Sequence, residues 1–344
     1  MSTPVTVLMP FYNPGRFLRE AVESVIGQTF TDWKLILIDD GSTQNVHSQI
    51  QKYLQDSRIK LLKLEKNVGQ SQALNRGLEL VDTPFIVQLD SDDKFFPHTL
   101  GVLVNEARKQ PEDVAVFSGN MQVIHEDDRG NLMFTTTNQG RPFTDKYDFI
   151  LANTSLWPRF YRTSAIRLVG GWPTDDPYGG RVMEDKQVLL RLIERYRFHW
   201  VDQTLYIHRR HPNNHTNQIA LYAEMVEWSI RQALKRWGGT YEPVFVTYGI
   251  GWKRLERLIP VSPGGQSKPV PAARPAVSPA KPPAKPQAAP AKPPASPAQG
   301  TGPRPAKKPP TPPANISPYG TQNAGPGTGP YTGPGTAPGT GPGT

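Results

Sequence analysis

The chain has 344 residues, including 37 prolines, 30 glycines and no cysteine, and it carries a formal net charge of +9. The missing cysteine excludes disulfides, thiolate metal ligands and cysteine nucleophiles. The first residues, MSTPVTVLMPFYN, lack the basic region of a signal peptide, and no run approaches the roughly 18 apolar residues that a membrane-spanning helix needs. We therefore expect a cytoplasmic protein.

The positive charge is concentrated in a C-terminal tail, residues 262–344. This segment holds 24 of the 37 prolines and eight Lys or Arg residues but no Asp or Glu, so the remaining body carries 9 − 8 = +1. The basic balance therefore belongs to the tail and does not indicate that the body binds nucleic acid. A segment rich in Pro, Ala, Gly, Lys and Thr buries too little apolar surface to offset its ordering entropy, so we expect disorder.

Strands and helices alternate over the first part of the body. Apolar runs predict strands, and apolar residues at helical spacing predict helices. In chain order, the expected elements are strand 5–9, helix 16–28, strand 34–38, helix 44–54, strand 59–64, helix 70–81, strand 84–89, helix 97–109 and strand 114–117. Because these strands are apolar on both faces, we predict an α/β fold with a mainly parallel central sheet flanked by helices.

The pattern changes after Ser118. The elements expected next are a hairpin of strands 121–124 and 132–137, a helix over 185–196, a strand over 198–207 and an amphipathic helix over 220–237. We predict three segments in the whole chain: a folded domain over 1–240, a C-terminal extension of that domain over 241–261, and the disordered tail over 262–344.

Polar residues follow three of the expected strands. These segments are Pro10-Phe11-Tyr12-Asn13, Asp39-Asp40-Gly41-Ser42 and Asp90-Ser91-Asp92-Asp93. The carboxyl ends of parallel strands meet at one edge of a sheet, where the ligands of such folds bind. Three carboxylates within four residues repel one another, which favours a hard dication that binds oxygen ligands beside a diphosphate. The alternative is a solvated acidic loop, whereas Lys94 breaks the EF-hand calcium pattern.

Several motifs together resemble glycosyltransferase family 2, whose members are inverting enzymes with the GT-A fold. The motifs are VTVLMPFYN, AVESVIGQTFTDWKLILIDDGS, NVGQSQALNRGLEL, FIVQLDSDDKFFP, GGW and MEDKQVLLRL, in the order and spacing of that family. The resemblance, to bacterial members of the family, covers roughly residues 4–215, and the tail has no counterpart in it. It implies the GT-A (nucleotide-diphospho-sugar transferase) fold and the transfer of a sugar from a nucleoside diphosphate sugar to a hydroxyl group.

The resemblance also implies residues that bind the nucleotide sugar. They are Pro10, Tyr12, Asp39, Asp40, Asp90, Asp92, Arg209 and His211. Tyr12 would stack on the base, Asp40 would bind it, and Arg209 or His211 would contact the diphosphate from a closing loop. Without the resemblance, Tyr12 is equally an ordinary turn aromatic and Asp40 a residue that caps the next helix.

The metal and the catalytic base follow from the same resemblance. Asp90 and Asp92 match a D-x-D motif, so Mg²⁺ or Mn²⁺ is expected on Asp92 or on its neighbour Asp93. Asp185 matches the catalytic base, which would take a proton from the acceptor hydroxyl on the face opposite the leaving nucleotide. The alternative role of Asp185 is to cap its helix, where the helix dipole favours a carboxylate.

The substrates and two competing functions complete the predictions. Family habit favours UDP as the nucleotide and a cell-surface polysaccharide or other glycan as the acceptor. A sugar nucleotidyltransferase would need a glycine-rich basic loop after the first strand, but PFYNPGRFLRE contains only Gly15. A non-catalytic scaffold would act through the tail, whose lysines could also hold the protein at the inner face of a membrane or on an anionic polymer.

Overall fold

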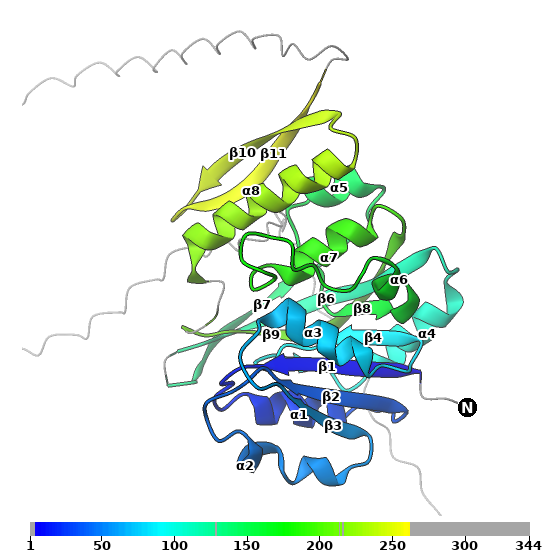
Figure 1. Cartoon of the computed structure of the whole chain (residues 1–344), viewed down its shortest axis with the longest axis vertical. Helices are drawn as coiled ribbons and strands as arrows, with labels where there is room; N and C mark the ends of the chain where they lie inside the picture. Colours follow the sequence, from blue (N-terminus) through cyan, green and yellow to red (C-terminus); the bar gives the residue numbers. More distant parts are fainter. Residues whose placement is uncertain (1–3, 128, 213, 215–216, 262–344) are drawn as a thin grey trace, which may run out of the picture. The chain divides into compact units, whose positions relative to one another are not determined.

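The computed structural model describes residues 4–127, 129–212, 214 and 217–261, so the predicted tail lies outside the described residues. Within the described part, nine strands form one sheet, and four of them are parallel neighbours in the order β3-β2-β1-β4 (Figure 1). Their bounds are β1 (Val5–Phe11), β2 (Trp33–Asp39), β3 (Ile59–Lys63) and β4 (Phe85–Gln88). The carboxyl ends of β1 and β2 are level, because Phe11 pairs with Asp39.

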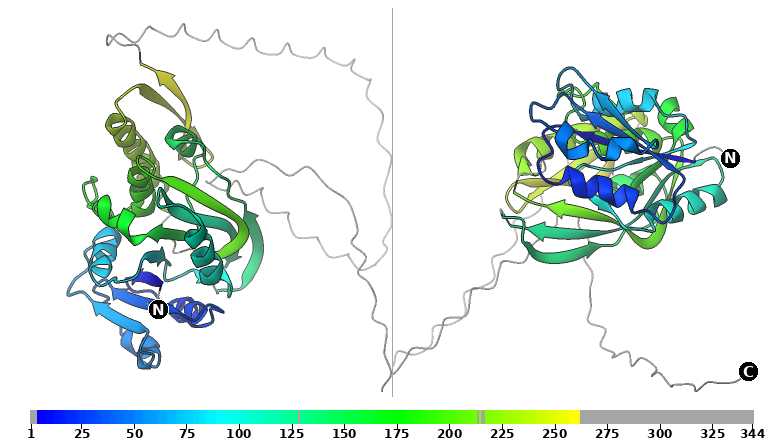
Figure 2. Two further views of the ribbon diagram at one scale, coloured as in Figure 1. Left: turned by 90° about the vertical axis from the view of Figure 1, so that its right-hand side faces the viewer. Right: turned by 90° about the horizontal axis from the view of Figure 1, so that it is seen from below.

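The other half of the sheet is mixed. Its strands are β5 (Lys94–Phe95), β6 (Val114–Glu126), β7 (Leu132–Asn138), β8 (Arg159–Arg162) and β9 (Arg197–Arg210). β8 is antiparallel to both β4 and β6, whereas β6 and β9 are parallel. Register shifts interrupt the β6–β9 pairing, and Figure 2 shows the bend of these long strands. The register places Arg159 opposite Gln88, just before the acidic loop that follows β4.

Helices cover both faces of the sheet. One face carries α1 (Leu18–Ile26) and α4 (Thr99–Lys109), and the other carries α3 (Gln70–Glu79), α6 (Thr163–Leu168) and α7 (Glu184–Leu192). Successive side chains of a strand point to opposite faces. In β1, Val7 therefore packs in the buried cluster of α1 and α4, and Leu8 packs in the cluster of α3 and α7. The expected α/β sheet flanked by helices is thus present.

Two helices and a hairpin extend this core beyond α7. The elements are α5 (Lys146–Leu151), α8 (Ile219–Arg236), β10 (Tyr241–Tyr248) and β11 (Trp252–Pro260). Figure 1 shows α8 lying along the hairpin, and an ion pair of 2.7 Å joins Arg231 to Glu242. The amide of Leu255 also donates to Asn153 Oδ1 at 2.7 Å. Among the helices that the structure describes, none has the length and apolarity needed to cross a bilayer.

Some elements differ from the sequence-based expectations. The helix expected over 44–54 is only the short α2 (His47–Ile50) and a 3₁₀ turn (Tyr53–Gln55), because most of its side chains are polar and exposed. The strands expected at 114–117 and 121–124 are one strand, because β6 continues through its irregular register. The sequence analysis did not predict β5, α5, β8, α6, β10 or β11.

Candidate active site

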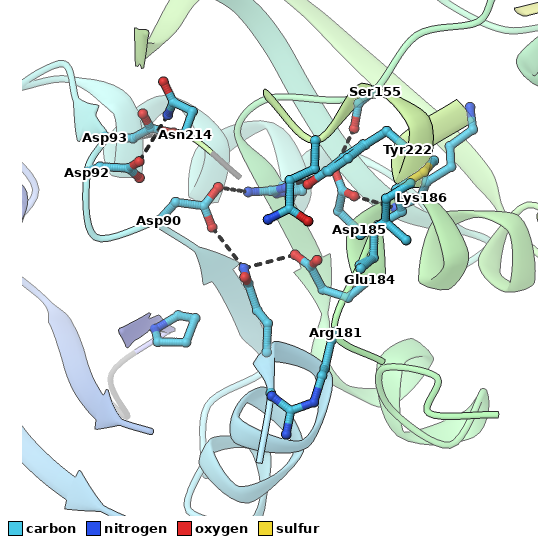
Figure 3. Close-up of a pocket in the computed structure, with 18 of the residues that line it drawn as sticks. Asp90, Asp92, Asp93, Ser155, Arg181, Glu184, Asp185, Lys186, Asn214 and Tyr222 are labelled. Atoms are coloured by element: carbon cyan, nitrogen blue, oxygen red, sulfur yellow. Dashed lines mark hydrogen bonds and ion pairs between the residues drawn. The ribbon is translucent and has the colours of Figure 1, made fainter. Parts of the chain in front are cut away.

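The carboxyl ends of β1, β2 and β4 border a cavity of about 730 Å³. Eight of the ten residues expected in the site line it: Pro10, Tyr12, Asp40, Asp90, Asp92, Asp93, Asp185 and His211. Of the expected residues that the structure describes, Asp39 and Arg209 do not line it. Figure 3 shows the acidic loop after β4 on one side of the cavity and the start of α7 on the other. The structure therefore brings the strand-end carboxylates and Asp185 to one space.

Asp40 organises the loop that borders the cavity beside β2. Its side chain is buried, and its carboxylate oxygens accept hydrogen bonds from the amides of Val68 (2.7 Å) and Gly69 (2.9 Å). The loop after β2 lies so close to the loop that contains Lys66 that residue 41 must be glycine. Its φ is +70°, and a Cβ at this position would lie 2.4 Å from the carbonyl carbon of Lys66. The sequence Asp40-Gly41 thus fixes a backbone arrangement at this edge of the sheet.

Tyr12 and Asp39 end neighbouring strands but have different surroundings. Tyr12 is 47% exposed and lines the cavity, so its ring can take part in stacking. Asp39 is buried, and its Oδ1 accepts a hydrogen bond of 2.8 Å from the Ser42 amide within its own turn. The position of Asp39 favours a role in shaping the turn, and its predicted contact with the nucleotide stays a prediction.

Asp92 is the most accessible of the three carboxylates after β4, with 31% of its side chain exposed. Its Oδ2 lies 3.2 Å from His211 Nε2 and accepts a hydrogen bond of 3.3 Å from Asn214 Nδ2. One carboxylate and one imidazole therefore face each other at this end of the cavity. No cluster of three or more His, Asp or Glu side chains suited to a metal ion occurs among residues 4–261 where the structure describes them.

Asp93 is enclosed, in contrast to Asp92. Only 1% of the residue is exposed, and its carboxylate accepts from the Tyr206 hydroxyl (2.9 Å) and the Arg209 amide (2.7 Å) and lies 3.1 Å from His208 Nδ1. Burial alone would lower the pKa of His208, but the Asp93 charge raises it overall. These contacts tie the acidic loop to β9 and leave Asp93 with little capacity for a further ligand.

Arg209 is directed away from the cavity. Its side chain is 4% exposed, and its guanidinium donates to Glu20 at 2.9 Å and also pairs with Glu126. Its Nε donates to the Asp92 carbonyl oxygen at 2.9 Å. Arg209 therefore supports the loop after β4 on the side away from the cavity. A direct contact with diphosphate would require Arg209 to leave these partners.

Asp185 lies in the first turn of α7 and faces the cavity. Its Oδ2 accepts hydrogen bonds from Ser155 Oγ (2.7 Å) and Arg159 Nη1 (2.9 Å). Burial alone would raise the pKa of Asp185, but the Arg159 charge and the hydrogen bonds from Ser155 and the Lys186 amide hold this pKa below its ordinary value. The carboxylate is therefore ionised and fixed in orientation.

Arg159 joins the two sides of the cavity. It is 3% exposed, and while Nη1 binds Asp185, Nη2 donates to Asp90 Oδ2 at 2.5 Å. A buried charge is tolerated when it is paired and hydrogen-bonded, and this guanidinium has a carboxylate on each side. Sequence reasoning missed Arg159. A signal was present, since this arginine interrupts the otherwise apolar run Leu156-Trp157-Pro158-Arg159-Phe160.

Two further ionisable groups flank Asp185. Glu184 is buried and accepts from Gln70 Nε2 (2.9 Å) and Gln88 Nε2 (3.1 Å), and burial together with the Asp185 charge raises its pKa to about 8. Burial lowers the pKa of Lys186 to about 8, and its Nζ donates to a backbone carbonyl at 2.9 Å. The two neighbouring carboxyl groups are thus shifted in opposite directions: the pKa of Glu184 is raised by burial and by the Asp185 charge, and the pKa of Asp185 is lowered by Arg159.

Comparison with known proteins shows which family the N-terminal half of this chain matches. Residues 6–169 match the model of the family described as glycosyl transferase family 2. The chain therefore contains a glycosyltransferase family 2 domain, which confirms the resemblance seen in the motifs. Asp185, His211 and most of the α7–α8 region lie outside the matched residues.

Individual relatives agree with this assignment. The glycosyltransferase GlyG of Streptococcus pneumoniae is 34% identical over 140 residues, which is 40% of this chain and 46% of GlyG. The Escherichia coli protein named UDP-Glc:alpha-D-GlcNAc-diphosphoundecaprenol beta-1,3-glucosyltransferase WfgD is 32% identical over 121 residues, 35% of this chain and 47% of WfgD. The chain thus spans slightly less than half the length of these curated relatives.

A solved structure supports the fold. The mannosyltransferase PcManGT of Pyrobaculum calidifontis, solved in complex with GDP-Man and Mn²⁺, superposes with a TM-score of 0.51 at 14% identity. The match covers 68% of this chain and 65% of that one. At this identity the likeness shows the fold alone, and it confirms the predicted GT-A fold.

Proposed function

We propose that this protein is an inverting glycosyltransferase that moves a sugar from a nucleoside diphosphate sugar to a hydroxyl group. The observation that carries the proposal is the shared cavity: Tyr12, Asp40 and Asp92 from three strand ends line the same space as Asp185. Each residue had an ordinary structural alternative when taken alone. Their convergence on one cavity, with three of the four inside the residues that match the family 2 model, favours the functional role of the group.

The β1–β2–β4 end is the proposed donor site. Tyr12 offers an exposed ring for the base, and Asp40 shapes the loop beside it. The accessible Asp92 carboxylate suits a hard dication, because such ions prefer oxygen ligands, and the His211 imidazole nitrogen lies 3.2 Å from that carboxylate, within reach of the same ion. We therefore assign Asp92 and His211, rather than the enclosed Asp93, to Mg²⁺ or Mn²⁺. When bound there, the cation would offset charge on the departing diphosphate.

Asp185 is the proposed base at the other end. As the acceptor oxygen bonds to the anomeric carbon, the bond from that carbon to the diphosphate oxygen breaks, and Asp185 takes the hydroxyl proton. Single in-line displacement of this kind inverts the anomeric configuration. Ser155 and Arg159 hold the carboxylate in place, and because its pKa is lowered, proton transfer accompanies bond formation rather than preceding it.

The relatives supply a first choice of substrates. WfgD is named for a UDP-Glc donor, and TuaG of Bacillus subtilis, 37% identical over 92 residues, is named for teichuronic acid biosynthesis. We accordingly propose a UDP sugar as donor and a cell-surface polysaccharide or its precursor as acceptor. Such chemistry fits a cytoplasmic enzyme, and contact of the basic tail with a membrane or an anionic polymer remains a further proposal.

Thermal denaturation tests the donor site before the substrates are known. We expect UDP with Mn²⁺, at concentrations well above Kd, to raise the melting temperature by about 5 °C or more, since the ligand binds only the native state. GDP and dTDP with Mn²⁺ measure the preference for the base, and Mn²⁺ alone is the control. An unchanged melting temperature with every nucleoside diphosphate would contradict the proposal and favour a non-catalytic body.

A further inference from the structure

Arg181 carries a positive charge on the wall of the cavity that no carboxylate balances among the residues that the structure describes. The side chain is exposed and lines the cavity. Its guanidinium donates from Nη1 to Asn67 Oδ1 at 2.5 Å and from Nη2 to the Asn67 carbonyl at 3.2 Å, and both acceptors are neutral. Arg159 and Arg209, by contrast, each pair with two carboxylates. A guanidinium has more N–H donors than these two contacts use, so Arg181 can donate to a ligand.

The position of Arg181 is fixed by its neighbours. The Ser71 amide, in the first turn of α3, donates to the Gly180 carbonyl at 3.0 Å, and the Gly180 amide donates to Asp176 Oδ2 at 2.7 Å. The stem of Arg181 lies on Gly69, where φ is +94° and a Cβ would lie 2.6 Å from Arg181 Cγ, so only glycine fits at this contact. A side chain that is held in this way loses little additional freedom when it binds a ligand.

A series of hydrogen bonds places Arg181 at the end of the cavity where the base is proposed to lie. The segment after β1 joins the segment after β2, because the Asn13 amide donates to Ser42 Oγ at 3.0 Å. Asp40 joins the latter to the segment after β3, through the two backbone amides described above. Arg181 in turn contacts Asn67 in that last segment. The exposed ring offered to the base directly precedes Asn13, so the four segments form one continuous wall.

The proposed donor site also sets which edge of the base meets Arg181. In Figure 3, Arg181 and Asp92 lie on different sides of the cavity. With the diphosphate at Asp92, the ribose-bearing N1 atom of a pyrimidine faces the segment after β4, and C4, across the ring from N1, faces the segments after β2 and β3. A guanidinium donates hydrogen bonds and accepts none. It therefore pairs with the 4-oxo group of uracil, whereas the 4-amino group of cytosine presents N–H donors at the same place.

We propose that Arg181 selects the base of the donor, by donating a hydrogen bond to the 4-oxo group of a uracil ring that stacks on Tyr12. The inference rests on the proposed transferase function, because the position of the diphosphate orients the base. It adds a residue that lies outside residues 6–169, which match the family model. Since the base takes no part in bond breaking, the contact contributes equally before and during transfer. Its removal should raise the KM for the donor and leave kcat unchanged.

Two nucleotides test the contact from the ligand side, in the unchanged chain. UDP and 4-thio-UDP differ only in the atom on C4, and sulfur accepts hydrogen bonds more weakly than oxygen. Both are titrated calorimetrically into the full chain with Mn²⁺. We expect UDP to bind about five- to tenfold more tightly than 4-thio-UDP. Equal affinity for the two nucleotides would overturn the inference, whatever the variants show.

The variant Arg181→Met tests the same contact from the protein side, since it keeps the stem over Gly69 and removes the N–H donors. We expect UDP to bind about tenfold more weakly, CDP binding to change by less than about twofold, and UDP and 4-thio-UDP to become equivalent. Arg76→Met is the matched control, because Arg76 is 61% exposed on α3 and does not line the cavity. Circular dichroism checks that both variants fold. A loss of equal size for UDP and CDP would overturn the inference, in favour of a phosphate contact or of a role in shaping the loop.

The response of the unchanged chain separates this inference from the proposed function. If UDP with Mn²⁺ raises its melting temperature but Arg181→Met and Arg76→Met bind all three nucleotides alike, Arg181 does not select the base and the transferase proposal stands. Tighter binding of GDP than of UDP would likewise overturn the inference alone. If no nucleoside diphosphate stabilises the unchanged chain, the proposed function fails at its own test and the inference falls with it.

Discussion

The two ends of the cavity are built from different kinds of residue. The proposed donor end consists of polar loops that directly follow β1, β2 and β4, and each loop is a short run such as Asp90-Ser91-Asp92-Asp93. The proposed acceptor end includes apolar side chains from α5, α8 and β11, and α5 and β11 are separated by roughly a hundred residues of chain. The residues of the proposed donor end can therefore be recognised as short motifs in the sequence. The apolar lining at the other end forms only when elements that are distant in the sequence pack together.

Asp185→Asn should have the largest effect and should act on the acceptor end alone. We expect a loss of transfer of about 10³-fold, because the amide cannot take the proton, with the melting-temperature increase from UDP and Mn²⁺ retained. Initial rates and thermal denaturation measure the two effects. Asp175→Asn, which is exposed and does not line the cavity, is the control. Turnover close to that of the unchanged chain would remove Asp185 from the mechanism.

Asp92→Asn should affect the donor end. We expect transfer to fall about 10²-fold and Mn²⁺ to lose its contribution to stabilisation by UDP, since the accessible carboxylate beside His211 is gone. Melting curves with UDP, with and without Mn²⁺, measure this. Asp82→Asn alters an exposed carboxylate paired with Lys34 and should change nothing. If Mn²⁺ added as much to stabilisation by UDP in Asp92→Asn as in the unchanged chain, the metal would have to bind groups other than Asp92.

Arg159→Gln tests the link between the two ends through the pH dependence. The guanidinium lowers the pKa of Asp185, so its removal should raise that pKa and move the acid limb of the kcat/KM profile to higher pH. Transfer should therefore fall more at pH 6 than at pH 8. Arg159→Lys keeps the positive charge and should restore part of the profile. An acid limb that does not move in Arg159→Gln would show that Arg159 does not set the basicity of Asp185.

Removal of residues 262–344 should have the smallest effect. The described residues that line the cavity all come before residue 262, so we expect transfer to a soluble acceptor to stay within about twofold of the full chain. Initial rates at matched concentration measure it. A truncated protein that folds, as judged by circular dichroism, but has lost transfer would make the tail part of the catalytic unit.

The fold and the donor end were accessible from the sequence because their signals are local. The apolar strands 5–9, 34–38 and 84–89 and the polar runs after them predicted the sheet edge that the structure shows. The mixed half was harder, since β8 is only four residues long and is antiparallel to both neighbours. Because β8 is so short, the sequence pattern did not indicate the strand that carries Arg159.

The acceptor end escaped prediction for a physical reason. Val226 and Trp252 have the same apolar character as core residues, and only the packing of α8 against the hairpin places them at a cavity. The position of Arg209 was not visible either, because its partners Glu20 and Glu126 are far away in the sequence. Charged side chains can be found by type, but their orientation depends on tertiary contacts.

The configuration of the transfer product tests the central claim most directly. A panel of UDP, GDP and dTDP sugars is incubated with Mn²⁺ and acceptors, and the anomeric proton of the product is followed by NMR. The account predicts one product whose anomeric configuration is opposite to that of the donor. A product with the donor's configuration, or a full panel of donors left unconsumed, would contradict the account.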